Sequence, residues 1–198
     1  MTAHTDINPH HLTSAPSTRE RIVLAAHDLF YQEGIRATGV DRIIAQAGVT
    51  KVTFYRHFPS KHDLILAFLA HRHERWIAWF ANALQRYGKQ VKYKGIKALL
   101  PTLNEWFTDD RFRGCAFINS ATELGGTLPD VLTITQQHKD DMIGLIAKLL
   151  PESAAQQERA FAIALAVDGA IVRAQCDAKP EAALQGLASI INAFESGN

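Results

Sequence analysis

Apolar residues recur at helical spacing along almost the whole chain, and this pattern constrains the fold more than any other feature. The first run falls at positions i, i+3, i+4, i+7 and i+8, occupied by Ile22, Ala25, Ala26, Leu29 and Phe30. Ser17 and Glu20 form a capping-box pattern before this run, and Gly34 suits the end of the helix. No segment of the sequence shows the alternation of a half-buried strand. The sequence therefore predicts an all-α protein with about nine helices.

Glycine, proline and capping residues divide the pattern into separate helices. A second apolar run stops at Gly48, and a third begins at Thr50 and is ended by Pro59. Ser60 and Asp63 then form a capping pair that opens a long helix. Gly95 and Pro101 interrupt the apolar run that follows, over residues 91–107. The predicted helices after the first are 40–47, 50–58, 60–87, 91–107, 114–124, 131–150, 154–175 and 181–194.

Composition sets the class of protein. The chain has 198 residues, of which 47% are apolar and 21% charged, close to globular averages. No apolar run is long enough for a membrane span, and the first residues lack the basic and apolar regions of a secretory signal. Cys115 and Cys176 have no metal-ligand spacing. We expect a soluble cytoplasmic protein without metal or cofactor, in which residues 1–16 form a disordered arm.

The two short helices around Gly48 have the pattern of a helix-turn-helix. Apolar side chains from both can pack inward, namely Val40, Ile43, Ile44, Phe54 and Phe58. This packing leaves a set of hydrogen-bond donors outside, namely Lys51, Thr53, Tyr55, Arg56 and His57. Nine Lys and Arg against six Asp and Glu lie between Ser17 and Arg75, so the region is net positive. A helix with such donors fits the major groove of DNA.

A family resemblance is specific at these residues. The run ATGVDRIIAQAGVTKVTFYRHFPSKHDLILAFL resembles the DNA-binding region of the TetR family of bacterial transcriptional regulators. The matching elements include Ala47-Gly48-Val49, Thr50-Lys51, Phe54-Tyr55 and His57-Phe58, within a resemblance that covers about residues 17–69. The resemblance implies a helix-turn-helix DNA-binding domain over 17–62 and an effector-binding and dimerisation domain over 63–198.

The resemblance also implies which residues contact DNA: Thr38, Thr50, Lys51, Val52, Thr53, Tyr55, Arg56, His57 and Lys61. Tyr55, His57 and Lys61 would mainly contact phosphates. Base edges would be read by Lys51, Thr53 and Arg56. The family often has glycine in place of Val52, whose side chain can instead contact a thymine methyl group. Two alternatives are a solvated Lys61 and an Arg56 that pairs with an acidic neighbour.

For the remainder of the chain, the resemblance implies a homodimer that binds a small-molecule effector and a palindromic double-stranded operator, most often as a repressor released by ligand. Aromatic and polar residues in the middle are candidates for the effector pocket: Trp76, Trp79, Phe80, Leu103, Trp106, Phe107, Cys115, Phe117, Asn119 and Glu123. Aromatic residues at helical spacing are more often plain core than a pocket, so core packing is the alternative. A stripe on the last two long helices is the candidate dimer interface: Ala160, Ala164, Ile171, Ala174, Leu184, Leu187, Ile191 and Phe194. Asp168 is expected to be a polar position at the edge of an interface, or to pair with Arg173 or with a partner subunit.

Cys115 suggests a second kind of regulator. Arg111 and Arg113 lie close to it in sequence and could favour its reactive thiolate, so that the protein would sense an oxidant or electrophile through this residue. The alternative is a buried cysteine that packs as a small apolar side chain. A helical enzyme and a partner-binding protein are further alternatives. The sequence contains no GxSxG, P-loop, HExxH or dinucleotide-binding motif, so catalysis has no identified machinery and we expect no enzyme.

Overall fold

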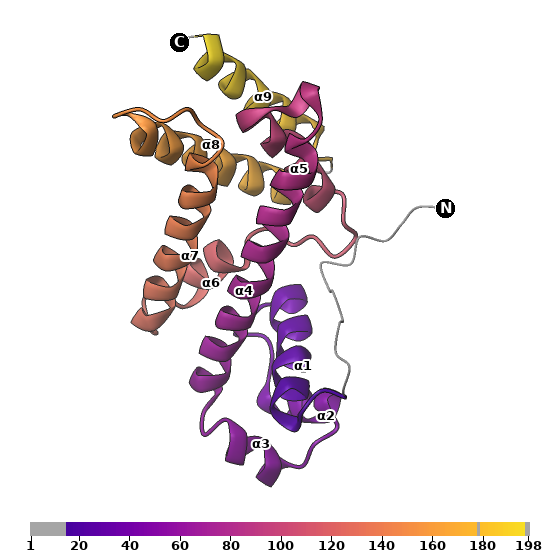
Figure 1. The fold of residues 1–198 in the computed structure, drawn as a ribbon. Coiled ribbons are helices and arrows are strands. Elements are labelled where there is room, and N and C mark those ends of the chain that lie inside the picture. Colours follow the sequence, from indigo (N-terminus) through magenta and orange to yellow (C-terminus); the bar gives the residue numbers. More distant parts are fainter. Residues whose placement is uncertain (1–14, 178, 197–198) are drawn as a thin grey trace. The chain divides into compact units, whose positions relative to one another are not determined.

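The computed structural model describes residues 15–177 and 179–196. Within these ranges the chain is helical throughout, with nine α-helices, two short 3-10 helices and no strand (Figure 1). The predicted all-α fold is therefore confirmed. Among the same residues, no helix is both long and apolar enough to cross a bilayer.

The helices form two compact units. The first unit contains the chain up to Trp76 together with Ala116–Thr135, and the second contains Ile77–Cys115 and the chain from Gln136 onward. The predicted DNA-binding domain, 17–62, lies wholly within the first unit, whereas 63–198 is divided between the two. The arm expected for residues 1–16 falls almost entirely outside the described residues.

The first unit is built from short capped helices and the beginning of a long one. Its helices are α1 (Thr18–Glu33), α2 (Val40–Ala47), α3 (Lys51–His57), the N-terminal part of α4 (Lys61–Gly88), α6 (Ala116–Leu124) and the start of α7 (Pro129–Ala147). The predicted capping box is present, because the Glu20 carboxylate accepts from the Ser17 N–H at 2.7 Å and the Ser17 hydroxyl accepts in return. The Asp63 carboxylate likewise accepts from the Ser60 N–H at 3.0 Å at the start of α4.

Local backbone chemistry makes the tight turn between α2 and α3. Gly48 ends α2 with φ +62°, a left-handed conformation that other residues rarely adopt. The Thr50 hydroxyl then accepts from the Thr53 N–H at 3.1 Å and caps α3. A seven-residue helix is marginal in water, so packing must hold it. Phe54 and Phe58 supply that packing, because both are buried with Ile43 in the core.

The second unit contains the C-terminal part of α4, η1 (Val91–Tyr93), η2 (Gly95–Ala98), α5 (Leu99–Phe107), α8 (Gln156–Cys176), α9 (Glu181–Ser196) and the rest of α7. Helices α8 and α9 pack against each other. The single interrupted helix predicted over 91–107 is replaced by η1, η2 and α5. Gly95 causes the break with φ +64°, whereas Pro101 lies in the first turn of α5, where its missing N–H is not needed.

Candidate nucleic-acid interface

Helix α3 has one buried side and one solvent-exposed side. Phe54 is fully buried, whereas Val52 and Tyr55 are 71% and 42% exposed although both are large and apolar or aromatic. Lys51 and Arg56 are also exposed, and Thr53 and His57 are half-buried. The exposed side therefore carries two cations, hydrogen-bonding groups and an aliphatic side chain on a short rigid helix. This set of groups suits phosphate oxygens and base edges.

The cations on this face are only weakly engaged within the chain. The Lys51 Nζ lies 3.6 Å from the Asp41 carboxylate, and the two side chains are 67% and 87% exposed. The ion pair therefore contributes little to the stability of the fold. Arg56 has no ion-pair partner among the residues that the structure describes. The expected alternative, in which an acidic neighbour neutralises Arg56, is thus not what the structure shows.

Two of the nine predicted contact residues point into the fold. Thr38 is fully buried, and its hydroxyl donates to the Gly34 carbonyl at 2.7 Å. The Lys61 Nζ donates to the Ile35 carbonyl at 2.6 Å. Burial lowers the pKa of Lys61, and the nearby Glu123 carboxylate opposes part of that change. Thr50 is a helix cap, as its spacing predicts, so the outward-facing candidates are Lys51, Val52, Thr53, Tyr55, Arg56 and His57.

The ten predicted effector residues are divided between the two units. Trp76, Phe117, Asn119 and Glu123 belong to the first, and Trp79, Phe80, Leu103, Trp106, Phe107 and Cys115 belong to the second. Trp76 and Phe117 are buried. Both Glu123 carboxylate oxygens accept hydrogen bonds from backbone N–H groups, at Ile35 (3.1 Å) and at Arg36. Sequence gives no signal for this contact, since the partners are more than eighty residues apart.

In the second unit the predicted aromatic residues pack on one another. The ring of Trp106 lies 5.2 Å from that of Phe112 and 6.2 Å from that of Trp79. The Trp79 indole N–H donates to the Glu105 carboxylate at 3.1 Å, and the Tyr87 hydroxyl donates to the same carboxylate at 2.7 Å. Burial and these interactions with Glu105 raise the pKa of Tyr87. Phe107 also lines a polar cavity of about 440 Å³ with Asp109, Phe112, Arg113, Ala174, Gln175, Asp177, Lys179 and Pro180.

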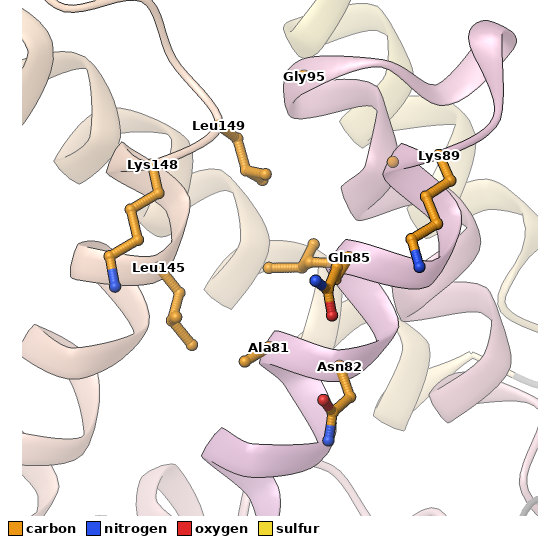
Figure 2. A pocket seen from close by; sticks show the side chains of 10 residues that line it. Ala81, Asn82, Gln85, Lys89, Gly95, Leu145, Lys148 and Leu149 are labelled. Atoms are coloured by element: carbon orange, nitrogen blue, oxygen red, sulfur yellow. The ribbon is translucent and has the colours of Figure 1, made fainter.

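A larger groove in the second unit lies between the end of α4 and the end of α7. Its volume is about 590 Å³, and its lining residues are Ala81, Asn82, Leu84, Gln85, Gly88, Lys89, Gly95, Leu145, Lys148 and Leu149. Figure 2 shows Leu145 of α7 and Leu149, just beyond the end of α7, on one wall, and Lys148 and Lys89 on opposite walls. No sequence pattern predicts this groove. The polar positions 82, 85 and 89 recur at helical spacing, but that pattern is equally typical of a solvated helix face.

Cys115 is buried, and a lysine of α7 lies at its sulfur. The Lys139 Nζ lies 3.6 Å from the Cys115 Sγ and 2.6 Å from the Asp168 carboxylate. Arg113 donates to the carbonyls of Asp110 and Phe112. Asp168 therefore pairs with Lys139, and the expectation that it pairs with Arg173 is wrong, because Arg173 lies 3.0 Å from Asp177.

The predicted dimer stripe lies mostly inside the chain itself. Six of its eight members are buried in the single chain, namely Ala160, Ala164, Ile171, Ala174, Leu187 and Ile191. Leu184 and Phe194 are half-buried. The exposed apolar side chains on α8 and α9 are instead Phe161, Leu165, Val172 and Ile190. The spacing of the stripe correctly marks packing between α8 and α9, which need not be packing between subunits.

Comparison with known proteins agrees with this geometry. The sequence profile described as "Bacterial regulatory proteins, tetR family" matches residues 22–68. The HTH-type transcriptional activator FasR of Mycolicibacterium smegmatis is 36% identical over 67 residues, which is 34% of this chain and 31% of that protein. The HTH-type transcriptional repressor BepR of Brucella suis is 25% identical over 137 residues, 69% of this chain and 66% of that protein. The matched regions thus cover about one-third and just under two-thirds of these relatives.

The fold gives an independent comparison over almost the whole chain. A TetR-family transcriptional regulator from Streptomyces coelicolor has a crystal structure that superimposes with a TM-score of 0.74 at 26% sequence identity. The superposition covers 89% of this chain and 95% of that one. Family and fold are those of regulators that are not enzymes. The helix-turn-helix sequence and the all-helical architecture together identify the chain as a member of the TetR family of bacterial DNA-binding transcriptional regulators.

Proposed function

We propose that this protein is a ligand-responsive repressor, acting in the cytoplasm as a homodimer on a palindromic operator. The exposed face of α3 is the observation that carries the DNA-binding part of the proposal. Its buried aromatic residues hold the helix rigidly, so Lys51, Thr53, Tyr55, Arg56 and His57 face solvent at fixed spacing. Val52 adds an apolar contact suited to a thymine methyl group.

Binding to the DNA upstream of the gene tests this proposal directly. A protein that neutralises several phosphates loses affinity steeply as salt concentration rises. We expect a protected site with two-fold symmetry in footprinting and a steep salt dependence in fluorescence anisotropy. Flat, sequence-independent binding would contradict a specific operator. A reporter gene placed behind the operator would separate repression from activation, a point on which the two named relatives differ.

A homodimer follows from the need for sufficient base contacts, since one short helix reads only a few base pairs. The proposed interface now rests on the exposed apolar residues Phe161, Leu165 and Val172 of α8, with Ile190 of α9. Residues 161, 165 and 172 recur at helical spacing and form one face. A second copy of the chain is the occupant that two-fold operator symmetry requires. Sedimentation of Leu165→Glu should give a monomer that remains folded, whereas an unchanged dimer would place the interface elsewhere.

The effector site is proposed for the second unit. Two features support it: the cluster of Trp79, Trp106 and Phe107, and the groove between α4 and α7. Leucines line the groove, and Lys89 and Lys148 lack ion-pair partners among the described residues. Such a lining favours a small molecule with an apolar body and a negative charge. Mass spectrometry of ligand that co-purifies with the native protein would identify it, and a polycationic ligand would contradict this assignment.

A second candidate function is sensing of an electrophile through Cys115. The contact between the Lys139 Nζ and the Cys115 Sγ supports it, because it places a cation beside a nucleophilic sulfur. In such a reaction the sulfur forms a bond to an electrophilic carbon and the thiol proton passes to solvent. Intact-mass measurement after treatment with N-ethylmaleimide, with Cys115→Ser and Cys176→Ser as a matched pair, tests it. Modification confined to exposed Cys176 would leave Cys115 as a core residue.

A further inference from the structure

The segment that joins α1 to α2 is held on both sides by charged residues from distant helices. From α6, the Glu123 carboxylate accepts the N–H groups of Ile35 (3.1 Å) and Arg36. From the first turn of α4, the Lys61 Nζ donates to the Ile35 carbonyl at 2.6 Å. The peptide groups at Ile35 are therefore bound by an anion on one side and by a cation on the other. All these residues lie within the first unit.

Water could satisfy the backbone of an ordinary surface turn, so this arrangement requires a reason. Ile35 is only 2% exposed, and burial lowers the pKa of Lys61, which means that the ammonium group is held at an energetic cost. Hydrogen bonds from backbone N–H groups to a carboxylate are roughly twice as strong as neutral ones. The segment leads directly into α2 and, through Gly48, into α3. Its position consequently sets where the exposed face of α3 lies.

We propose that Glu123 and Lys61 form a clasp that positions the DNA-reading helices against α6, and that neither residue serves the effector or phosphate role expected from the sequence. The inference rests on the proposed DNA-binding function. Opening the clasp would free the segment at Ile35 and let α2 and α3 change orientation as one body. Any ligand that displaces α6 would then alter DNA binding without touching α3.

The experiment combines Glu123→Gln, Lys61→Met and the double variant, with Glu74→Gln as a matched control. Glu74 is an exposed carboxylate on α4 in the same unit. Glutamine keeps the size of Glu123, but it has no negative charge and only one oxygen that can accept a hydrogen bond, so it cannot bind both N–H groups as the carboxylate does. Each clasp variant should weaken operator binding about tenfold. The double variant should be no weaker than the single ones, because both remove the same clasp.

Two readouts separate a positioning role from a phosphate contact. Loss of a phosphate contact at Lys61 would lower the slope of log affinity against log salt by about 1 and would add to the Glu123 effect. A clasp predicts an unchanged slope. It also predicts that the variants discriminate less between the operator and a site with two base pairs inserted at its centre. Helices α2 and α3 would be held less tightly, so they would tolerate a changed distance between the two half-sites. Additive effects together with a reduced slope would overturn the proposal.

Amide hydrogen exchange keeps the test independent of DNA. In the clasp variants the amides of Ile35 and Arg36 should exchange at least tenfold faster, while amides in α8 should be unchanged. Unchanged exchange at both residues would overturn the clasp even if DNA binding were altered. If the wild-type chain bound no operator, the proposed function would fail, whereas the exchange result would still decide whether the clasp exists. Glu74→Gln should behave as wild type in every measurement.

Discussion

Helix α3 and the groove between α4 and α7 both combine apolar and cationic side chains. They differ in whether the protein itself covers the apolar side chains. In α3 the apolar side is filled by the protein itself, because Phe54 and Phe58 are buried in the first unit. In the groove, Leu145 and Leu149 line open space. Because its apolar side is packed against the protein, α3 is a rigid element suited to a large polyanion. The groove, whose leucines are not covered, is a concave surface that a small molecule can occupy.

The largest effect is expected where the apolar filling of α3 is removed. Phe54→Ala should lower the free energy of unfolding by about 3–5 kcal/mol, because it removes a fully buried ring and leaves a cavity. Chemical denaturation measures this loss directly. The matched control is Tyr55→Ala on the exposed side, which should barely change stability but should weaken DNA binding. Equal stability losses in the two variants would break the distinction between the two sides of α3.

A smaller effect is expected from Arg56, the cation proposed to contact a base edge. Arg56→Ala should cost about 1–3 kcal/mol of discrimination at particular base pairs, because a bidentate contact to a base edge is lost. Binding measured across a set of single-base operator variants would locate those positions. Uniform weakening on every sequence would instead assign Arg56 to a phosphate. The fold should be intact by circular dichroism, since Arg56 is exposed.

The groove should respond more weakly still, because its lysines are exposed to solvent. Binding of 8-anilinonaphthalene-1-sulfonate, an apolar anion, should weaken about fivefold in the double variant Lys89→Gln/Lys148→Gln. The uncharged analogue N-phenyl-1-naphthylamine should bind both proteins alike. Lys179→Gln, at the smaller cavity, is the control variant. If the anionic and neutral probes weakened together, the lysines would act on groove shape and not on charge.

The last expected effect is a pH dependence in the first unit, which is absent at neutral pH and appears only as the pH falls. Burial is the largest cause that lowers the pKa of His71, and together with the charges of His27, Arg75 and Arg72, and against that of Asp28, it brings the pKa to about 4. Because the pKa is below its ordinary value of 6.5, the unfolded chain binds the proton more tightly. Stability is therefore complete above about pH 6.5 and decreases as the pH falls toward 4. Thermal unfolding should show a steeper loss over this range in the wild type than in His71→Gln.

Much of the exposed face of α3 could be predicted, because the residues that shape it lie close together in sequence. Caps such as Ser17 and Thr50, the left-handed Gly48 and the spacing of Phe54 and Phe58 act within a few residues of one another. These local features correctly indicate the helix boundaries and the buried side of α3. The same reasoning fails for Thr38, whose hydroxyl bonds to a carbonyl four residues away in a buried turn. A motif position alone does not reveal which way a side chain points.

Contacts between residues far apart in the sequence could not be predicted from local patterns. The stripe on α8 and α9 was predicted as a dimer interface, yet Leu187 and Ile191 are buried within one chain. Helical spacing shows that a face is apolar, but it does not show whether the same chain or a second copy covers it. Likewise, local sequence draws attention to Arg111 and Arg113 beside Cys115, but it gives no sign of Lys139, a cation 24 positions away that lies at the sulfur.

The sequence by itself thus determined the helical class, the caps, the turn around Gly48 and the family, because each depends on residues within one or two helical turns. The tertiary structure alone decided which partner each charged side chain takes. Glu123 was expected at an effector and Lys61 at a phosphate, but both bind the backbone at Ile35. A charged group binds whatever complementary group the packed helices bring within hydrogen-bond distance. That distance is set by the packing of the whole unit, which local sequence patterns do not specify.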